Sequence, residues 1–541
     1  MLNFKIIIFT VIFRLLIIFS LTAVVSTSRA QTGSVSPAGD KPAITLVVTN
    51  DSQSGIFHFP ELESRKFYSS PAKKEQIEAL IIAGQEDKAW HLLRSYVRKF
   101  SISNFRLDAP LLLELVRLSE KFGTQQETLS WIKLILKHKP AELDSLPLVK
   151  KYLELEQFSE RNFLNPEQYV NLISSGFDPE KYRLSINTPQ NLGEEINSKY
   201  PDYAPVMGNQ DNVLLFSSKR NRHSIDLNAP ADEDLFISRK YEDIWQKAVE
   251  LVNINTTNNE GSACLSRDGK VLYFSRCNAP GSYGNCDLYV ARLNRDSVWS
   301  DIQNLGASVN SVGWESHPAL TPRGDTLYFA SNRLGGFGLS DIYYSVKSRN
   351  GKWSKAKNAG PVINTRYSEV SPFVHHKFNE LYYSSDGLPG SFGDFDIYRS
   401  SRKKHYWTEP VNLGPLVNTA GSEYYFTMDV QSIEMYYAGT STESAQNLDL
   451  YSRLLPMEAQ PNANTLLTGK VLNQDGSPAS GVVVITDQDD PIEIAPKILN
   501  ESGAFSFRLI LGHHYTVTVR TEQMGLVQKQ IHLVYPHHRK P

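Results

Sequence analysis

Four tryptophans recur in the middle of this chain at a constant spacing of 54 residues, and a block of sequence repeats with them. Each block holds an apolar-aromatic string followed by an Asp-Leu/Ile-aromatic triplet. The tryptophans are Trp245, Trp299, Trp353 and Trp407, and the triplets begin at Asp234, Asp287, Asp341, Asp396 and Asp449. A period of this length, filled with short strand-like segments, is typical of a β-propeller. Five copies predict five blades of four strands over residues 183–456, with a sixth, unrecognisable blade as the main alternative.

The two ends of the repeat region predict how the ring closes. An Asn-Leu-Gly-type element recurs, and its first copy, at Asn191, precedes any blade. The last blade, over residues 424–454, ends without its Trp strand. We therefore expect residues 183–190 to supply that outer strand, which would close the ring and remove its sheet edges.

The repeated strings carry a family resemblance. Asp341-Ile-Tyr and Leu327-Tyr-Phe, separated by a Gly-rich loop, resemble the TolB-type, WD-like propeller repeats of bacterial envelope proteins. The resemblance covers about half of the chain. It implies the fold, and it says little about function.

The first 30 residues have the pattern of a cleaved targeting segment. Lys5 and Arg14 flank a first apolar run, the apolar stretch 15–25 follows, and Ser28-Arg-Ala30 offers small residues at a cleavage site. The alternative is an uncleaved anchor over residues 6–25, but Arg14 would place a charge in the middle of it. We expect export to the periplasm or the outer membrane, with no transmembrane segment after cleavage.

Two further regions lie between this segment and the repeats. Residues 31–70 are predicted to be a linker, rich in Gly, Ser and Pro at its start and interrupted by one possible strand at 44–49. Residues 71–180 show helical periodicity, and the turn at Gly84–Trp90 resembles the one between the two helices of a tetratricopeptide repeat. That resemblance implies a groove for a peptide or partner helix, and a plain helical spacer is the alternative.

Residues 464–535 alternate apolar strands with Asp-Gly and Ser-Gly turns, which predicts a small β-sandwich. The strings resemble the carboxypeptidase-regulatory-like domain, which carries no peptidase chemistry. The full order of parts resembles PorE-like envelope proteins associated with type IX secretion. Those proteins usually end in an OmpA-like peptidoglycan-binding domain, whereas this chain stops at Pro541, so peptidoglycan anchoring is not expected.

Composition narrows the classes of partner. A formal net charge of -2 gives no electrostatic reason to bind nucleic acid. Of the three cysteines, Cys277 and Cys286 bracket a loop between two neighbouring strands and are predicted to form a disulfide after export. Cys264 falls in a predicted buried strand and is interpreted as a small core residue.

The repeated acidic residues invite a catalytic or metal-binding interpretation. Glu315, Glu369 and Glu423 recur in the loops that enter the blades. Glycoside hydrolysis needs two carboxylates in different environments, so a glutamate repeated by symmetry is better interpreted as a loop brace. Asp394 and Asp396 lack a calcium-loop pattern and are interpreted as turn caps.

Other familiar chemistry has no clear support in the sequence. The chain has no Gly-x-Ser-x-Gly elbow of a serine hydrolase. The histidine pairs at 375–376, 513–514 and 537–538 lack partners at metal spacing, and we assign them to exposed loops and tails. We expect no metal and no other cofactor.

Function should then lie on a surface. The Gly-rich loops 332–340 and 386–395 are expected to share one rim of the propeller with the Glu-bearing loops. The hypothesised partner-binding residues on that rim are Arg333, Phe337, Arg366, His317, Glu315 and Glu369. The sequence favours a non-enzymatic envelope scaffold that binds other envelope or secreted proteins. The alternative is a propeller that binds or hydrolyses a glycan.

Overall fold

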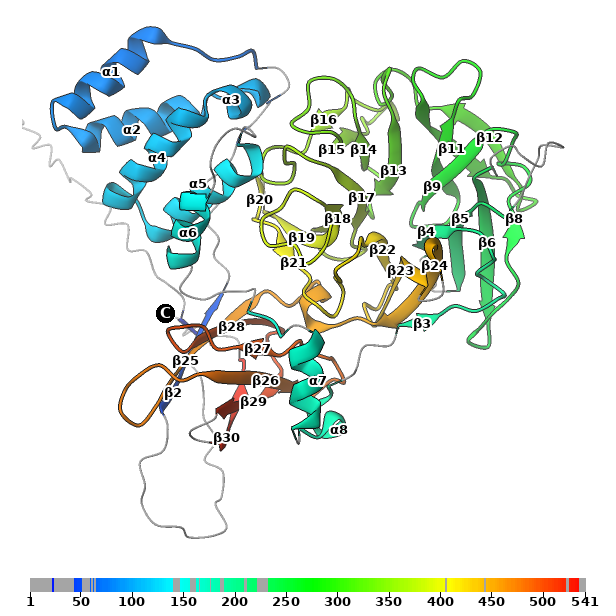
Figure 1. Cartoon of the computed structure of the whole chain (residues 1–541). Coiled ribbons are helices and arrows are strands. Elements are labelled where there is room, and N and C mark those ends of the chain that lie inside the picture. Colours follow the sequence, from blue (N-terminus) through cyan, green and yellow to red (C-terminus); the bar gives the residue numbers. More distant parts are fainter. Residues whose placement is uncertain are drawn as a thin grey trace, which may run out of the picture.

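The computed structural model describes residues 22–23, 43–50, 59, 62, 65–139, 146–155, 162–164, 166–175, 177–184, 189–208, 212–220, 232–403, 406–441, 444–521 and 525–534. Helices, a ring of sheets and a small two-sheet domain lie side by side (Figure 1). The predicted targeting segment 1–30 falls outside the described residues, apart from the short strand β1 (Thr22–Ala23).

Each copy of the sequence repeat forms one antiparallel sheet of the ring. The first two sheets are β4 (Asp202–Met207), β5 (Val213–Ser218), β6 (Asp234–Tyr241), β7 (Ile244–Trp245) and β8 (Val249–Glu250), then β9 (Asn259–Leu265), β10 (Val271–Cys277), β11 (Cys286–Leu293) and β12 (Trp299–Asn304). The third is β13 (Glu315–Leu320), β14 (Thr326–Ser331), β15 (Asp341–Val346) and β16 (Lys357–Asn358). The last two are β17 (Glu369–Val374), β18 (Glu380–Ser385), β19 (Asp396–Lys403), β20 (Tyr406–Trp407) and β21 (Val411–Asn412), then β22 (Tyr424–Met428), β23 (Glu434–Ser441) and β24 (Ser444–Leu454), to which β3 (Gln190–Asn191) is added.

The sheets close into a ring around their first strands. β4 contacts β9, and β9 contacts β13. β13 then contacts β17, β17 contacts β22, and β22 contacts β4 again. The apolar-aromatic strings form the second strands, and residues such as Leu272, Phe274 and Phe329 are fully buried between neighbouring sheets. A closed ring of radially arranged four-stranded sheets is a β-propeller architecture.

The expected closure is observed, with a shift in the residues that provide it. β3 pairs antiparallel with β24, Asn191 lying opposite Tyr451 and Gln190 opposite Ser452. The ladder is extended by Leu192, whose N–H donates to the carbonyl of Leu450 at 3.0 Å. The closing strand therefore lies at the end of the segment that the sequence indicated.

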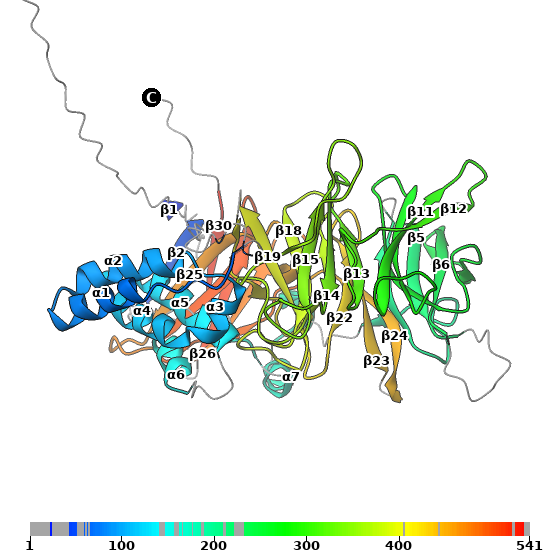
Figure 2. The same cartoon turned by 90° about the horizontal axis from the view of Figure 1, so that it is seen from above.

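Six helices form a separate layer beside the ring (Figure 2). They are α1 (Pro71–Ile82), α2 (Glu86–Val97), α3 (Ile102–Leu107), α4 (Ala109–Phe122), α5 (Gln125–His138) and α6 (Leu146–Leu155). Their core gathers residues such as Leu93, Phe100 and Trp131, which follow the predicted helical spacing. Among the helices that the structure describes, none is long and apolar enough to cross a membrane.

The C-terminal domain has two sheets, in the orders β1-β2-β25-β28 and β27-β26-β29-β30. Its strands are β25 (Thr465–Leu472), β26 (Gly481–Asp487), β27 (Lys497–Ile498), β28 (Ala504–Leu509), β29 (His514–Thr521) and β30 (Gly525–His532). One strand comes from the other end of the chain: β2 (Ala43–Asn50) pairs with β25 along its whole length. The segment predicted to be a linker thus completes a distant domain.

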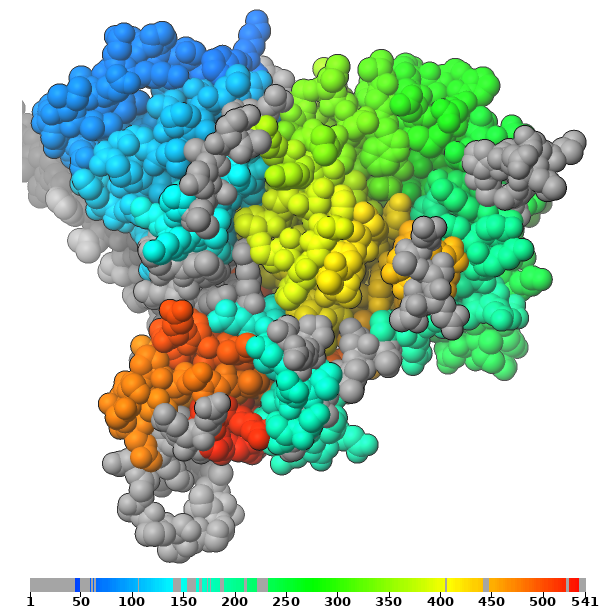
Figure 3. All heavy atoms as spheres, in the orientation of Figure 1, coloured from blue at the N-terminus to red at the C-terminus, as the bar shows by residue number. Residues whose placement is uncertain are grey.

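The helices α7 (Pro166–Ser174) and α8 (Pro179–Tyr182) pack on this domain rather than on α1–α6. Leu172, Phe177 and Tyr182 form a cluster with Val484 of β26. Figure 3 shows the blue-green segment of these helices against the orange-to-red C-terminal domain. In the structure, the predicted helical region 71–180 therefore divides between two bodies.

Candidate functional site

A buried carboxylate near the start of each first strand braces the loop that enters the sheet. Glu315 accepts hydrogen bonds from the N–H and the hydroxyl of Ser311, both at 2.6 Å, and from the hydroxyl of Ser331. Arg333 forms an ion pair with it at 3.1 Å. The equivalent carboxylates, which accept bonds in the same way from the residue four positions earlier, are Asp202, Glu260, Glu369 and Glu423. These contacts are those of loop braces.

The aspartate of each triplet has a second repeated role. Asp341 accepts from the backbone N–H groups of Phe337 and Gly338, and the side-chain amide of Asn358 donates to it at 2.7 Å. Asp396 makes the same contacts with Phe392, Gly393 and Asn412. In the sheet that closes the ring, Asn191 donates to Asp449 across 2.9 Å. Where the Asn-Leu-Gly element is kept, its asparagine is therefore the polar link between the triplet aspartate and the outer strand, at Asn191, Asn304, Asn358 and Asn412.

Burial raises the pKa values of several of these repeated carboxyl groups. The pKa of Glu369 rises to about 8, chiefly because its carboxyl is fully buried and secondly because Asp341 lies nearby. Burial also raises the pKa of Asp341 to about 6 and that of Glu423 to about 7. Raised carboxyl pKa values can mark catalytic acids. Here they belong to repeated residues whose oxygens are already committed to the backbone.

The residue two positions after each carboxylate has a left-handed backbone. These residues are Ala204 (φ 54°), Ser262 (φ 43°), His317 (φ 52°), Ser371 (φ 51°) and Tyr425 (φ 59°). A register shift accompanies each of them, so every first strand carries a β-bulge. All five line a pocket on the axis of the ring. The framework thus presents five equivalent positions to the axis and fills them with four different residue types.

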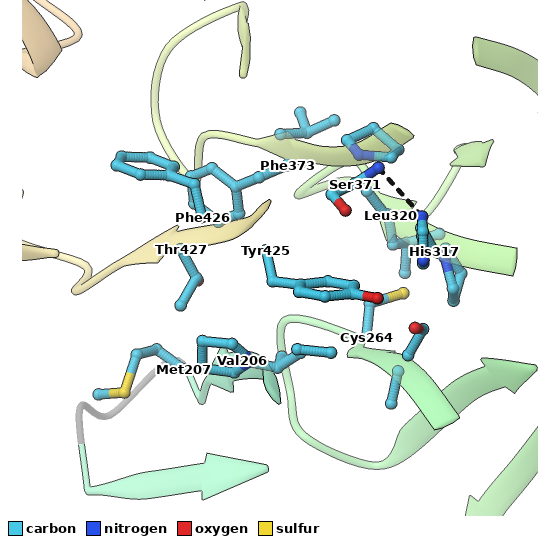
Figure 4. Close-up of a pocket in the computed structure, with 18 of the residues that line it drawn as sticks. Val206, Met207, Cys264, His317, Leu320, Ser371, Phe373, Tyr425, Phe426 and Thr427 are labelled. Atoms are coloured by element: carbon cyan, nitrogen blue, oxygen red, sulfur yellow. Dashed lines mark hydrogen bonds between the residues drawn. The ribbon is translucent and has the colours of Figure 1, made fainter. Parts of the chain in front are cut away.

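His317 and Tyr425 lie across this axial pocket (Figure 4). Their rings meet edge to face, with centroids 5.1 Å apart. The N–H of Ser371 donates to Nδ1 of His317 at 3.1 Å, and burial lowers the pKa of His317 to about 3, so the imidazole is neutral. The pocket has a volume of about 80 Å³, smaller than that of the hollow at the mouth.

A wider hollow opens at the mouth of the ring, on the side of the Gly-rich loops. Its volume is about 370 Å³, and it shares His317 and Tyr425 with the axial pocket. Its apolar lining includes Trp314, Leu339, Val370, Phe395, Tyr424 and Leu448. Among the described residues that line these two hollows, none is a carboxylate.

The six residues hypothesised from the sequence are all engaged within the chain. Glu315 and Glu369 are buried braces, and His317 lies on the axis. Arg333 pairs with Glu315 and lies over the ring of Tyr343. Phe337 and Arg366 face the helical layer, as the docking contacts below show. The predicted loops do surround the mouth, but these side chains offer little free surface.

The helical layer docks beside the mouth through the end of α5. Phe337 is 2% exposed and packs on Phe105 and His138, with ring centroids 5.7 and 4.8 Å away. Arg366 donates to the carbonyl of Lys139 at 2.7 Å. His138, whose pKa burial lowers to about 3, has Nε2 at 2.8 Å from the carbonyl of Pro361.

A buried ion pair lies at the centre of this docking contact. The ammonium of Lys137 is 2.7 Å from Glu409 and donates to the carbonyl of Val362 at 2.9 Å. The Lys137 side chain is 1% exposed, and burial lowers its pKa. These contacts fix α5 against the third and fourth sheets of the ring.

Exposed apolar side chains, which the sequence hypothesis did not include, lie on the loops on the mouth side of the ring, and one of them, Leu339, lines the hollow. They are Leu334 (93% exposed), Val312 (80%), Leu339 (70%), Tyr283 (49%), Tyr367 (47%) and Phe392 (38%). We call this set the apolar rim. All six lie on the Gly-rich loops or on the loops that enter the sheets. The sequence signal was the presence of two leucines, beside Phe337, in the Gly-rich loop 332–340.

The loops that carry the apolar rim are fixed to one another. The N–H of Leu339 donates to the carbonyl of Tyr367 at 2.8 Å, and Asn285 contacts Gly313 in the same way at 2.9 Å. A Cβ on Gly338 would lie 2.0 Å from the carbonyl oxygen of Tyr367, so only glycine permits this approach. Cys277 and Cys286 form a disulfide at the base of the loop that carries Tyr283. Cys264 is free and buried, and it lines the axial pocket.

The residue before each triplet aspartate differs in every sheet: Glu233, Cys286, Ser340, Phe395 and Leu448. Ser340, Phe395 and Leu448 line the mouth hollow. Glu233 is hydrogen-bonded to the hydroxyl of Tyr203, and burial raises its pKa. Of the five residues at this position, Glu233 is the one with an acidic side chain.

No family model matches the chain, and no curated protein matches it. Among solved structures, TolB from Acinetobacter baumannii is 12% identical over 52% of this chain and 54% of that one, with a TM-score of 0.29. The putative TolB from Agrobacterium tumefaciens is 11% identical over 60% and 96%, with a TM-score of 0.31. The catalytic domain of the Coprinopsis cinerea GH62 α-L-arabinofuranosidase is 12% identical over 49% and 96%, with a TM-score of 0.35.

Likenesses at this level do not extend to a ligand or a reaction. The class of the protein is defined by its own structure, as a closed ring of sheets joined to a helical layer and a two-sheet domain.

Proposed function

We propose that this chain is a five-bladed propeller protein of the cell envelope that acts without catalysis and binds a protein partner at the apolar rim. The observation that carries the proposal is the gathering of exposed apolar side chains around one mouth of the ring. Exposed apolar residues scattered singly need no explanation, whereas a group of them on one surface marks a binding site. Two of its members, Leu334 and Leu339, lie on the same loop and are 93% and 70% exposed.

The shape of the mouth indicates how the partner binds. The hollow is lined by Trp314, Phe395 and Tyr424 and narrows at His317 and Tyr425. Large aromatic side chains in a concave surface are typical anchors of protein interfaces. An apolar loop or chain end could enter the hollow while the apolar rim covers its flanks. The rigid loops would lose little conformational entropy on binding.

The expectation of an envelope protein rests on sequence. The targeting segment over 1–30, the tetratricopeptide-like helices and the carboxypeptidase-regulatory-like domain together resemble PorE-like envelope proteins. We therefore propose export to the periplasm or to the outer membrane, with a partner among envelope or secreted proteins. A role in type IX secretion is the most specific form of this proposal.

Site-specific photo-crosslinking in intact cells tests the proposed surface. A photoreactive residue at Leu334, Leu339 or Tyr367 is expected to give one common protein adduct. The matched control is Ile244, which is 66% exposed on β7 at the outer edge of the first sheet. A common adduct at the rim and none at Ile244 supports the proposal. Equal labelling at both surfaces, or no adduct at the rim, contradicts it.

Glycan binding is the second candidate, and Glu233 is the observation that favours it. A partly buried acid next to Tyr203, at a position that differs in each sheet, is where a sugar-specific group would be expected. Hydrolysis would need two carboxylates at the hollow, and the described lining residues include neither Glu233 nor any other acid. Glycan binding that is lost in Glu233→Gln but kept in Leu334→Ser would favour this candidate over a protein partner.

A further inference from the structure

Three potential metal-ligating side chains meet at one end of the C-terminal domain, far from the mouth of the ring. Asp487 ends β26, Asp489 lies in the following turn, and His513 directly precedes β29. One potential ligand atom from each of the three lies within 4.8 Å of the others. In the sequence, 24 positions separate Asp489 from His513. This distance is why sequence spacing gave no metal signal.

The backbone holds both carboxylates in place before any ion binds. Oδ1 of Asp487 accepts from the N–H groups of Asp489 and Asp490 at 2.9 and 3.1 Å. Its other oxygen, Oδ2, is 2.9 Å from Nδ1 of His513. Asp489 is held in a similar way, because the N–H of His514 donates to its Oδ2 at 2.6 Å. Each carboxylate is therefore oriented by the main chain.

Burial and charge separate this cluster from an ordinary exposed group of acids. Asp487 is fully buried, and the His513 side chain is 20% exposed. A third carboxylate, Asp490, has its Oδ2 at 3.8 Å from Nε2 of His513. Among the described residues, Arg183 contacts these turns and donates to the carbonyl oxygens of Asp487 and Asp490 rather than to their carboxylates. The carboxylate charge at this end of the domain is thus available to a cation.

We propose that Asp487, Asp489 and His513 bind a divalent transition metal ion of the zinc class. Two carboxylate oxygens and one imidazole nitrogen form a mixed donor set that suits zinc, whereas calcium prefers oxygen ligands alone. Zinc bonds to these atoms are about 2.0–2.2 Å long. Ligand atoms around one ion then lie a little over 3 Å apart, so the present separations need only small side-chain shifts. The ion would lie between Oδ2 of Asp487 and Nδ1 of His513, and any hydrogen that joins these atoms would leave to solvent.

Neighbouring residues supply the outer support that metal ligands usually have. Nδ1 of His514 lies 3.1 Å from Oδ2 of Asp489, and the imidazole of His514 stacks on His532 of β30 with ring centroids 3.8 Å apart. Such partners fix the orientation of a ligating carboxylate. The bound ion would fasten the end of β26 to the start of β29. Arg183 attaches the chain leading to the closing strand β3 at the same place.

Titration of the full, chelator-treated chain with ZnCl₂ tests the proposal. We expect one high-affinity Zn²⁺ per chain, and CoCl₂ in its place should give the visible absorption of a low-coordinate Co²⁺ site. His513→Ala and Asp489→Asn are expected to weaken binding at least about tenfold. Asp489 is the safer variant for folding, because its side chain is 43% exposed. Thermal unfolding of each variant checks that the domain is intact.

Two substitutions serve as matched controls. Asp475→Asn removes a carboxylate from another turn of the same domain, where it accepts from Ser477. His91→Ala removes an exposed histidine of α2. Zn²⁺ binding should be unchanged in both. Absence of binding would overturn the proposal and show an ordinary histidine–aspartate pair. Equal binding in the site variants would place the ion elsewhere, and binding of Ca²⁺ without Zn²⁺ would show a calcium site, so each of these results would also overturn it.

Discussion

The ring and the C-terminal domain are both built from short antiparallel strands, yet they are assembled in opposite ways. Each sheet of the ring takes its strands from one stretch of sequence, and only β3 comes from elsewhere. The C-terminal domain gathers β2 from residues 43–50 and the helices α7 and α8 from residues 166–182 around strands that begin at residue 465. A local unit repeated along the chain is legible in sequence, whereas a domain completed by distant segments is not.

The largest effect is expected when β2, the strand from the distant segment, is disrupted alone. Val48 is 2% exposed in the sandwich core, and its neighbour Val47 is 44% exposed on the other face of β2. Val48→Asp buries an unpaired charge and is expected to cost about 5 kcal/mol, at the upper end for single substitutions. Val47→Asp should change stability by less than about 1 kcal/mol.

Urea unfolding of the full chain, with hydrogen exchange to locate the effect, measures this difference. Protection should fall in β25 and β28 and stay unchanged in the ring. Similar effects of the two substitutions would show that β2 is not a true member of the C-terminal domain.

The next largest effect is expected at the joint between the helical layer and the ring. Glu409→Ala leaves the ammonium of Lys137 buried with a single carbonyl partner, Val362. Breaking a buried pair in this way costs about 3 kcal/mol or more. Hydrogen exchange should rise at the end of α5 and in residues 361–366, while the cores of both bodies stay protected.

The exposed pair of Lys151 and Glu120 provides the control for this joint. Glu120→Ala should leave the exchange pattern unchanged, because exposed pairs contribute little. Replacing both Lys137 and Glu409 by apolar residues should recover much of the docking. If Glu409→Ala has no effect on exchange at the joint, the contact does not hold the helices in place.

A smaller effect is expected in the ring, where the buried carboxyl group of Glu369 makes the unfolding free energy depend on pH. The pKa of Glu369 is about 8 in the folded state, against an ordinary value of 4.5 for a glutamate side chain. Protonation therefore favours folding: the contribution is fully present below about pH 4.5 and is lost as the pH rises through about 8. One group changes the unfolding free energy by at most about 1.4 kcal/mol per pH unit.

Comparison with Glu369→Gln isolates this group from all others. The free energy of unfolding of the wild type should fall more steeply than that of the variant between pH 5 and 8. Urea unfolding at several pH values measures both slopes. Equal slopes would mean that Glu369 stays ionised within its set of donors.

Much of the fold could be predicted because the repeat fixes local pairing. The 54-residue repeat, to which Asp287 and Trp299 belong, indicated the sheets. The early copy of the Asn-Leu-Gly element, at Asn191, indicated the strand that closes the ring. The pairing of Val48 with Leu467 could not be predicted, since an isolated eight-residue strand carries no mark of its partner.

The candidate site was predicted only as a region. Repetition identified Glu315 and Glu369 as braces, and the loop order indicated one rim. Phe337 was expected at the surface because its loop is Gly-rich, but the helical layer covers it through Phe105 and His138, which lie 232 and 199 residues earlier in the chain. His375, assigned to an exposed loop, is fully buried and contacts Ser432. The pair at 537–538 lies outside the described residues.

The central claim is that repeated residues build the ring while the apolar rim binds a partner, and paired variants test it most directly. The double variant Leu334→Ser and Leu339→Ser should have an unfolding free energy within about 0.5 kcal/mol of the wild type. The same variant should abolish recovery of the crosslinked partner. Glu315→Gln should do the reverse, lowering stability while the folded fraction still binds. The account is contradicted if the rim variant keeps the partner at wild-type recovery.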